Sequence, residues 1–197
     1  SYLNHKRIFD RNEHILPAEF SESKWNFIEE NGKSSTGIAA GGISWCYVKE
    51  AVSILKSRYP ESEEFKNISF LKIGTPYPFP EKLAEKFLTE NKKIVVFEEL
   101  DPVIENALIH ICGKKGIKSD ICGKADGTVP EAGELSVETA VSVLEKVLFN
   151  SEKKEESVAE SVPELPVRPP VLCAGCPHRG SFYAVKQAMK GKKTAYC

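Results

Sequence analysis

The fold is decided by the run Lys92-Lys93-Ile94-Val95-Val96-Phe97, in which four apolar residues follow two lysines without a break. A strand that is buried on one face alternates apolar and polar residues, whereas a continuously apolar strand is buried on both faces. Glu98-Glu99-Leu100 ends the run. Asp101 is then a good N-cap, and Pro102 a good first residue, for a helix. The sequence therefore predicts a central strand of a parallel sheet, followed directly by a helix.

The same order of strand, turn and helix is found twice upstream. Thr36-Gly37-Ile38-Ala39-Ala40 is a short apolar run that ends in Gly41-Gly42, and we expect Ser44 to cap the helix after it. Residues 68–74 form a second strand with a closing glycine. A stiff, proline-rich loop then leads into a helix at residues 80–91.

Downstream, residues 117–123 are expected to form a short fourth strand, and Ser136 to cap a helix that reaches about residue 150. Strands that alternate with helices at this spacing form parallel sheets with right-handed crossovers. The predicted fold class is therefore α/β, with a three-layer, parallel-sheet domain over residues 36–150. Residues 1–35 are mixed in polarity, and we expect them to be a connecting segment that packs on an upstream domain.

Residues 151–170 break this pattern. They are charged, poor in apolar residues and contain four prolines, which is typical of an extended linker between domains. A second α/β domain is expected to begin at residue 171, with a helix at Ser181–Met189 and the start of a strand at residues 193–196. Residues 171–197 are thus predicted to be the truncated start of that domain.

The segment with the most concentrated chemistry is Cys173-Ala174-Gly175-Cys176-Pro177-His178-Arg179-Gly180. Two cysteines at this spacing are half of a tetrahedral zinc site or of an iron–sulfur site, and His178 or Cys197 could supply a further ligand. A redox-active cysteine pair normally opens a helix directly after a strand, and the four residues after Cys176 weaken that reading. A metal site, a loop that cradles a cofactor and a structural turn all remain open.

The residues after the two cysteines favour an anion. Arg179 is cationic, Gly180 lets the backbone approach a phosphate, and the amides of Ser181 and Phe182 are expected at the positive end of a helix. The alternative is an ordinary capped helix on which the guanidinium is exposed.

Two other groups of residues lie where ligands of α/β proteins bind. Gly41-Gly42 follows the first strand, but its spacing is neither a dinucleotide fingerprint nor a P-loop, so a tight turn is the better interpretation. Glu98 and Glu99 end a central strand, where carboxylates more often cap helices or face solvent than catalyse reactions.

The six cysteines are not expected to form disulfides, because the sequence has no secretory signal. Cys46, Cys112 and Cys122 lie in partly apolar patterns and are interpreted as buried free thiols. Only Cys173 and Cys176 have the spacing of ligands.

Composition excludes several classes of protein. Hydrophobic residues make up 41% and charged residues 28%, with a net charge of −1, so neither a nucleic-acid groove nor a basic membrane patch is indicated. No apolar run approaches the roughly 18–20 residues that span a bilayer. The chain starts at Ser1 without an initiator Met or an apolar signal core, so we expect an internal cut and a cytoplasmic location.

Four motifs together resemble one family. The sequence at residues 168–183, around Cys-Pro-His-Arg-Gly, looks very like the entry to the thiamine-diphosphate-binding domain of the indolepyruvate:ferredoxin oxidoreductase α subunit. Residues 37–51, 71–80 and 96–102 resemble the middle domain of that family, which is similar to the transketolase C-terminal domain. The resemblance covers nearly the whole chain in order.

This resemblance implies the reaction of the 2-oxoacid:ferredoxin oxidoreductases. Indolepyruvate and related aryl 2-oxo acids are decarboxylated on thiamine diphosphate with magnesium, electrons pass through [4Fe-4S] clusters to ferredoxin, and the acyl group goes to coenzyme A. A β subunit completes the enzyme, which is typical of anaerobic cells. The residues expected to contact the cofactor are Cys173, Gly175, Cys176, His178, Arg179 and Gly180, and the candidate metal ligands are Cys173, Cys176 and Cys197.

Three parts of the family pattern are absent from the sequence. They are the pyrimidine-binding domain with its activating glutamate, the Gly-Asp-Gly motif that binds magnesium and diphosphate, and the cysteine-rich tail. We therefore expect an internal fragment that is inactive alone. Two alternatives remain. One is a non-catalytic metal-binding or assembly module. The other is a fragment of a related pyruvate or 2-oxoglutarate oxidoreductase, because no residue in this sequence can be assigned to recognition of the substrate side chain.

Overall fold

Four parallel strands form the centre of the larger of two units in this computed structural model, which describes residues 1–30, 35–149 and 171–191. The strands are β2 (Thr36–Gly41), β3 (Ile68–Ile73), β4 (Lys93–Phe97) and β5 (Asp120–Cys122). A further strand, β1 (Phe27–Glu29), pairs antiparallel with β3, so the order across the sheet is β1-β3-β2-β4-β5. The predicted α/β fold is confirmed, and the antiparallel edge strand is an addition that the sequence did not predict.

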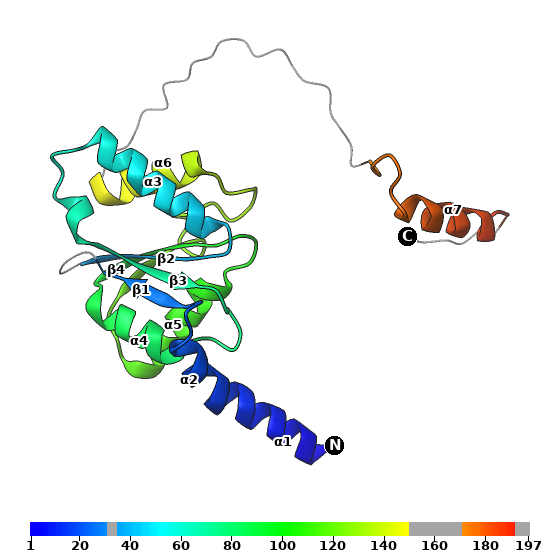
Figure 1. Ribbon diagram of the computed structural model, residues 1–197, viewed down its shortest axis with the longest axis horizontal. Coiled ribbons are helices and arrows are strands. Elements are labelled where there is room, and N and C mark those ends of the chain that lie inside the picture. Colours follow the sequence, from blue (N-terminus) through cyan, green and yellow to red (C-terminus); the bar gives the residue numbers. More distant parts are fainter. Residues whose placement is uncertain (31–34, 150–170, 192–197) are drawn as a thin grey trace, which may run out of the picture. The chain divides into compact units, whose positions relative to one another are not determined.

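Helices cover both faces of the sheet (Figure 1). The helices on one face are α3 (Ser44–Arg58) and α6 (Val137–Phe149), and those on the other face are α4 (Glu81–Glu90) and α5 (Val103–Lys115). Neighbouring residues in register point the same way: Phe70, Ile38 and Val95 face α3 and α6, whereas Leu71, Ala39 and Val96 face α4 and α5. The three-layer arrangement is therefore as predicted, and β4 is buried on both faces.

The helices of residues 1–21 contribute little to this core. They are α1 (Tyr2–Asp10), the π-helical η1 (Arg11–Ile15) and α2 (Leu16–Ser21), none of which has a buried residue. The buried Asn26 holds the end of this segment to the sheet, since its amide donates to the carbonyl of Phe20 at 2.9 Å and its Oδ1 accepts from the backbone amides of Gly74 and Thr75 at 2.8 and 3.1 Å. A short 3₁₀ helix, η2 (Glu64–Asn67), precedes β3.

Two predictions about α3 are wrong. Ser44 does not cap the helix but is its first residue, and its buried Oγ has no hydrogen-bond partner among the described residues. Cys46 is exposed rather than buried. The reason is that the face packed on the sheet carries Ser44 and, at helical spacing after it, Val48, Ala51, Val52 and Leu55. Cys122 is buried, as expected.

The smaller unit, Glu155–Cys197, is described at residues 171–191. It contains a turn at Cys173–Cys176 and the helix α7 (His178–Ala188), which has no buried residue. The linker predicted at residues 151–170 and the strand predicted at residues 193–196 lie outside the described residues. None of the helices in the described ranges is long and apolar enough to cross a membrane.

A glycine in β2 allows α4 to lie close to the sheet. A Cβ atom on Gly37 would lie 2.5 Å from Cζ of Phe87 and 3.0 Å from Cγ of Asn91. Phe87 is completely buried, so its ring has no free space to move into. Small size, rather than a special backbone conformation, is what this position requires.

We expect Gly37→Ala to lower the free energy of unfolding by roughly 1–3 kcal/mol, because the added methyl overpacks the β2–α4 contact. Urea unfolding followed by circular dichroism measures the change. Gly113→Ala is the matched control, since a Cβ on Gly113 in α5 would meet nothing within 4 Å. Gly113 lies in the last turn of α5, and alanine there is expected to raise stability by at most about 0.5–1 kcal/mol. Equal effects of the two changes would contradict the packing argument.

Candidate functional site

The larger unit has a cavity of about 380 Å³ at the carboxyl edge of its sheet. The helix after β2 covers one face and the helix after β4 covers the other, so the two connections separate at this edge. Open α/β sheets bind ligands in this crevice. The lining residues come from the ends of β2, β3 and β4 and the loops after them: Gly41, Gly42, Ile43, Ile73, Gly74, Pro76, Glu98, Glu99, Asp101, Val103 and Ile104.

On the β2 side of this cavity, the absence of a side chain at Gly41 lets the strand end lie close to Ile104 and Ile73. A Cβ on Gly41 would lie 2.7 Å from Cδ1 of Ile104 and 3.1 Å from the carbonyl oxygen of Ile73. Gly42 has φ +56°, which favours glycine, and the chain then enters α3. Gly41-Gly42 therefore forms the tight strand-to-helix turn that the sequence indicated.

Glu98 caps α5, a role that the sequence assigned to Asp101. Its Oε2 accepts from the amide of Ile104 at 2.7 Å and its Oε1 from the amide of Glu105 at 2.9 Å. Asp101 makes only a backbone contact to Val103 in this turn. Glu98 is 6% exposed, and burial raises its pKa although the backbone amides of α5 lower it. Both oxygens are thus used by the backbone, which favours capping over catalysis.

A second buried carboxylate extends this network. Glu105 accepts from the amide of Lys124 at 2.8 Å and from that of Ala125 at 3.1 Å. Lys124 is itself buried, and its Nζ donates to the carbonyl of Leu100. Leu100 has φ +59° and is 80% exposed. The network therefore fixes a bulky residue in a left-handed conformation beside the cavity, and nothing in the local sequence indicates this.

The described side chains that line the cavity are apolar or acidic. Glu99 accepts from the amide of Leu135 at 3.1 Å through one oxygen. The described lining contains no histidine, cysteine, lysine or arginine, so it offers no imidazole or thiol and no cation for a phosphate. It combines apolar surface with carboxylates.

The predicted site of the smaller unit is a surface loop. The amide of Cys176 donates to the carbonyl of Cys173 at 3.1 Å, and Gly175 has φ +76°, so the four residues form a tight turn. Sγ of Cys176 lies 3.2 Å from Nδ1 of His178. Cys173 is exposed and Cys176 half-buried.

One expectation about this loop is wrong. Helix α7 begins at His178, three residues before the predicted start, because Pro177 already has helical dihedral angles. The amides of Arg179 and Gly180 donate to the carbonyls of Cys176 and Pro177, at 3.1 Å each. The amides of Ser181 and Phe182 therefore lie inside the helix rather than at its open end.

The metal ligands remain a prediction. Cys197 lies outside the described residues. Within residues 1–30, 35–149 and 171–191, no three histidine, cysteine, aspartate or glutamate side chains are arranged to hold a metal ion. The turn brings Cys173, Cys176 and His178 onto one short loop, which is the part of the predicted set that the structure describes.

No protein-family profile matches the chain. The chain is 37% identical over 175 residues to the indolepyruvate oxidoreductase subunit IorA of Pyrococcus abyssi. The match covers 86% of this chain and 26% of that protein. It is 34% identical over 200 residues to the subunit of the same name from Thermococcus kodakarensis, covering 98% of this chain and 29% of the relative. The predicted resemblance is confirmed, and the chain spans less than a third of the length of these curated relatives.

A solved structure shares the fold. The chain aligns with a 2-oxoglutarate:ferredoxin oxidoreductase from Magnetococcus marinus, solved with 2-oxoglutarate, coenzyme A and succinyl-CoA bound, with a TM-score of 0.50. The alignment covers 75% of this chain and 24% of that chain at 18% identity, and it shows the fold alone. A split-gene transketolase in an inactive β4 tetramer aligns with a TM-score of 0.46 at 18% identity over 63% of this chain and 41% of that one.

The raised pKa of Glu98 predicts a dependence of stability on pH. The folded chain binds this proton more tightly than the unfolded chain, so the stabilisation is complete below the ordinary value of 4.5 and is lost as pH rises through the raised pKa. We expect the free energy of unfolding of the wild type, minus that of Glu98→Gln, to fall as pH increases from 4.5 towards neutrality. Urea titrations at successive pH values measure it.

Glu138→Gln is the control with the opposite sign. Hydrogen bonds from its own backbone amide and from Ser136 lower the pKa of Glu138, so its stabilisation is present above the ordinary value and lost as pH falls. The corresponding difference is expected to rise with pH. If the difference in free energy of unfolding between the wild type and Glu98→Gln also rose with pH, burial would not be the dominant influence on the pKa of Glu98.

Proposed function

We propose that this chain, which is related in sequence to the indolepyruvate oxidoreductase subunit IorA, is part of a thiamine-diphosphate-dependent, iron–sulfur oxidoreductase. The proposed reaction is the oxidative decarboxylation of indolepyruvate and other aryl 2-oxo acids to aryl-acetyl-CoA, with reduction of ferredoxin and with a β subunit as partner. The observation that carries the proposal is the identity of 34–37% to relatives of this name over 82–98% of the chain.

The parts of the chain are proposed to have different roles. Residues 36–150 form the transketolase C-terminal-like middle domain, residues 151–170 the linker, and residues 171–197 the start of the cofactor domain, while residues 1–35 pack on an upstream domain. Both oxygens of Glu98, the buried carboxylate of the middle-domain cavity, accept from backbone amides, so this group is not available as a general base. The middle domain is proposed to support the reaction structurally.

The loop before α7 is proposed to border the cofactor diphosphate. The donor set suits that group: Arg179 is cationic, the positive end of an eleven-residue helix lies beside it, and the turn at Gly175 is exposed to a ligand. The proposed contacts come from Cys173, Gly175, Cys176, His178, Arg179 and Gly180. Thiamine diphosphate, when bound with magnesium, supplies the stabilised carbanion on which 2-oxo acids lose carbon dioxide.

The thiols are proposed to bind metal, with Cys173, Cys176 and Cys197 as ligands. The tight turn and the 3.2 Å distance between Cys176 Sγ and Nδ1 of His178 favour such a role, because sulfur and imidazole nitrogen are the ligand atoms that zinc sites use. The same observation favours the second candidate function, a non-catalytic module in which this loop holds zinc. The two candidates differ in the metal that they predict.

The isolated chain is expected to give no turnover of indolepyruvate with thiamine diphosphate, magnesium, coenzyme A and a viologen acceptor. A chimaera of the Pyrococcus abyssi relative that carries this chain in place of its matching 175 residues is expected to be active with its β subunit. In that chimaera Arg179→Gln should raise the thiamine diphosphate concentration for half-maximal rate by about tenfold, since a charge-assisted contact is lost. Assays of reduced viologen follow the rate.

The matched control is Lys186→Gln, which removes one positive charge from the same helix away from the loop. It should leave the cofactor dependence unchanged. Turnover by the isolated chain would contradict the fragment proposal. An assembled but inactive chimaera, or equal effects of the two substitutions, would contradict the proposed role of the loop.

Metal content separates the two candidate functions. After anaerobic reconstitution with iron and sulfide, we expect the purified chain to hold iron and to absorb visible light, and Cys173→Ser with Cys176→Ser to abolish both. Cys46→Ser, an exposed cysteine of the larger unit, is the control and should retain them. A colourless chain with one equivalent of zinc, lost in the double variant, would favour the module instead.

A further inference from the structure

We propose that the carboxyl edge of the sheet in the larger unit is a docking surface for a protein segment that presents a basic side chain next to an apolar one. The proposal concerns the cavity after β2, β3 and β4 and does not depend on the chemistry of the cysteine loop. It is carried by three observations on the described residues: apolar surface around the cavity, an excess of carboxylates, and a leucine held outward at its rim.

The rim of the cavity is apolar and exposed. Ile43 follows β2, Tyr77 follows β3, and Leu100 and Val103 follow β4; their side chains are 52%, 72%, 80% and 49% exposed. Ile43 and Val103 line the cavity of about 380 Å³, and direct neighbours of Tyr77 and Leu100 line it as well. Large apolar side chains that gather around a hollow mark an interaction site, whereas scattered ones do not.

The loops at this edge are strongly acidic. The loops that leave the carboxyl ends of the parallel strands, at residues 42–43, 74–80, 98–102 and 123–136, contain one cationic residue, Lys124, which is buried against the carbonyl of Leu100. Against it stand Glu98, Glu99, Asp101, Asp126, Glu131 and Glu134. Such an edge attracts a cationic partner and repels a phosphate or an acidic peptide.

The position of Leu100 is determined by the fold. Its φ of +59° lies in the left-handed region, its side chain is exposed, and the contact from Lys124 Nζ to its carbonyl holds that turn. Lys124 is fixed in turn because its own amide donates to the buried carboxylate of Glu105. An apolar side chain that is pre-organised in this way binds with less loss of conformational entropy than one on a mobile loop.

A side chain of arginine or lysine suits the cavity better than a small anion or a metal ion. Its aliphatic stem can pack on Ile43 and Val103 while its head reaches Glu99 and Asp101, the lining carboxylates that the α5 cap does not use. In the described part of the chain, no three carboxylates are grouped to hold a metal ion. The occupant is therefore a segment of protein.

The test uses the 197-residue chain and two acetylated, amidated peptides, Leu-Arg-Leu-Lys-Leu and Leu-Glu-Leu-Asp-Leu. In ¹⁵N-resolved NMR titrations, the basic peptide is expected to shift the amide signals of Gly42, Gly74 and Leu100, and the acidic peptide to shift none of them. Glu99→Gln with Asp101→Asn keeps the carbonyl oxygens but removes two charges, and should weaken binding by roughly tenfold. Leu100→Ala should weaken it by about fivefold.

The control is Glu61→Gln with Glu64→Gln, which removes two exposed charges at the opposite end of β3. It should leave the dissociation constant unchanged, and added salt should weaken binding to the wild type more than to the Glu99, Asp101 variant. Equal binding of both peptides, shifts outside the edge, or an equal loss in the control variant would overturn the proposal.

Discussion

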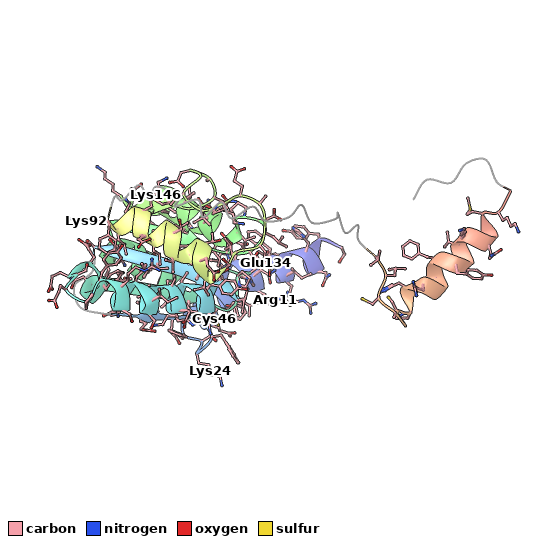
Figure 2. The ribbon with its side chains drawn as sticks, turned by 90° about the horizontal axis from the view of Figure 1, so that it is seen from above. Arg11, Lys24, Cys46, Lys92, Glu134 and Lys146 are labelled. Atoms are coloured by element: carbon pink, nitrogen blue, oxygen red, sulfur yellow. The ribbon has the colours of Figure 1, made fainter. Side chains whose placement is uncertain are left out.

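Ile94, Val95 and Val96 are each almost completely buried, although successive side chains of a strand point to opposite faces of the sheet. Such a strand needs a helix layer on each side, because apolar surface left in water costs about 25 cal/mol per Å². The connections after β2 and β4 therefore run to opposite faces and separate at the carboxyl edge. The cavity between them thus follows from the burial of β4, and the two faces of the sheet carry separate cores. Figure 2, seen from above the view of Figure 1, looks onto the side of the sheet that α3 and α6 cover.

The carboxyl edge is rigid because buried carboxylates replace missing backbone partners. The first amides of α5 have no partner within the helix, and Glu98 accepts from two of them. Glu105, the third residue of the helix, accepts in the same way from backbone amides of the loop after β5. Gly123 is required there, since a Cβ on it would lie 2.5 Å from the carboxyl carbon of Glu105. Two glutamates thus connect β4, α5 and the β5 loop, and the outward position of Leu100 is a consequence.

Sequence patterns predicted those features that depend on neighbouring residues. The parallel strands and their helices follow from runs and periodicities, and the cap at Ser136 was correct because it accepts from an amide three residues away. The features that the sequence did not predict depend on residues that are distant in the chain, or on two side chains that could accept from the same backbone amides. Strand β1 has only three half-buried residues and exists through pairing with β3. Asp101 is a good cap by type, but Glu98 reaches the same amides from the end of β4.

The two candidate sites also differ in how far the sequence predicted them, and they carry different chemical groups. The cysteine loop was recognised from a continuous sequence motif. The acidic, apolar edge has no such motif, because its residues come from four loops. The larger unit offers shape and fixed charge, but its buried carboxylates already serve the backbone. The smaller unit offers thiols, an imidazole and a guanidinium, but on an exposed loop where water screens their charges. Electrostatic catalysis needs such groups in a site from which water is excluded. This division suits a polypeptide in which the larger unit binds a partner. The chemistry of the cysteine loop then depends on other segments that enclose the loop and exclude water from it.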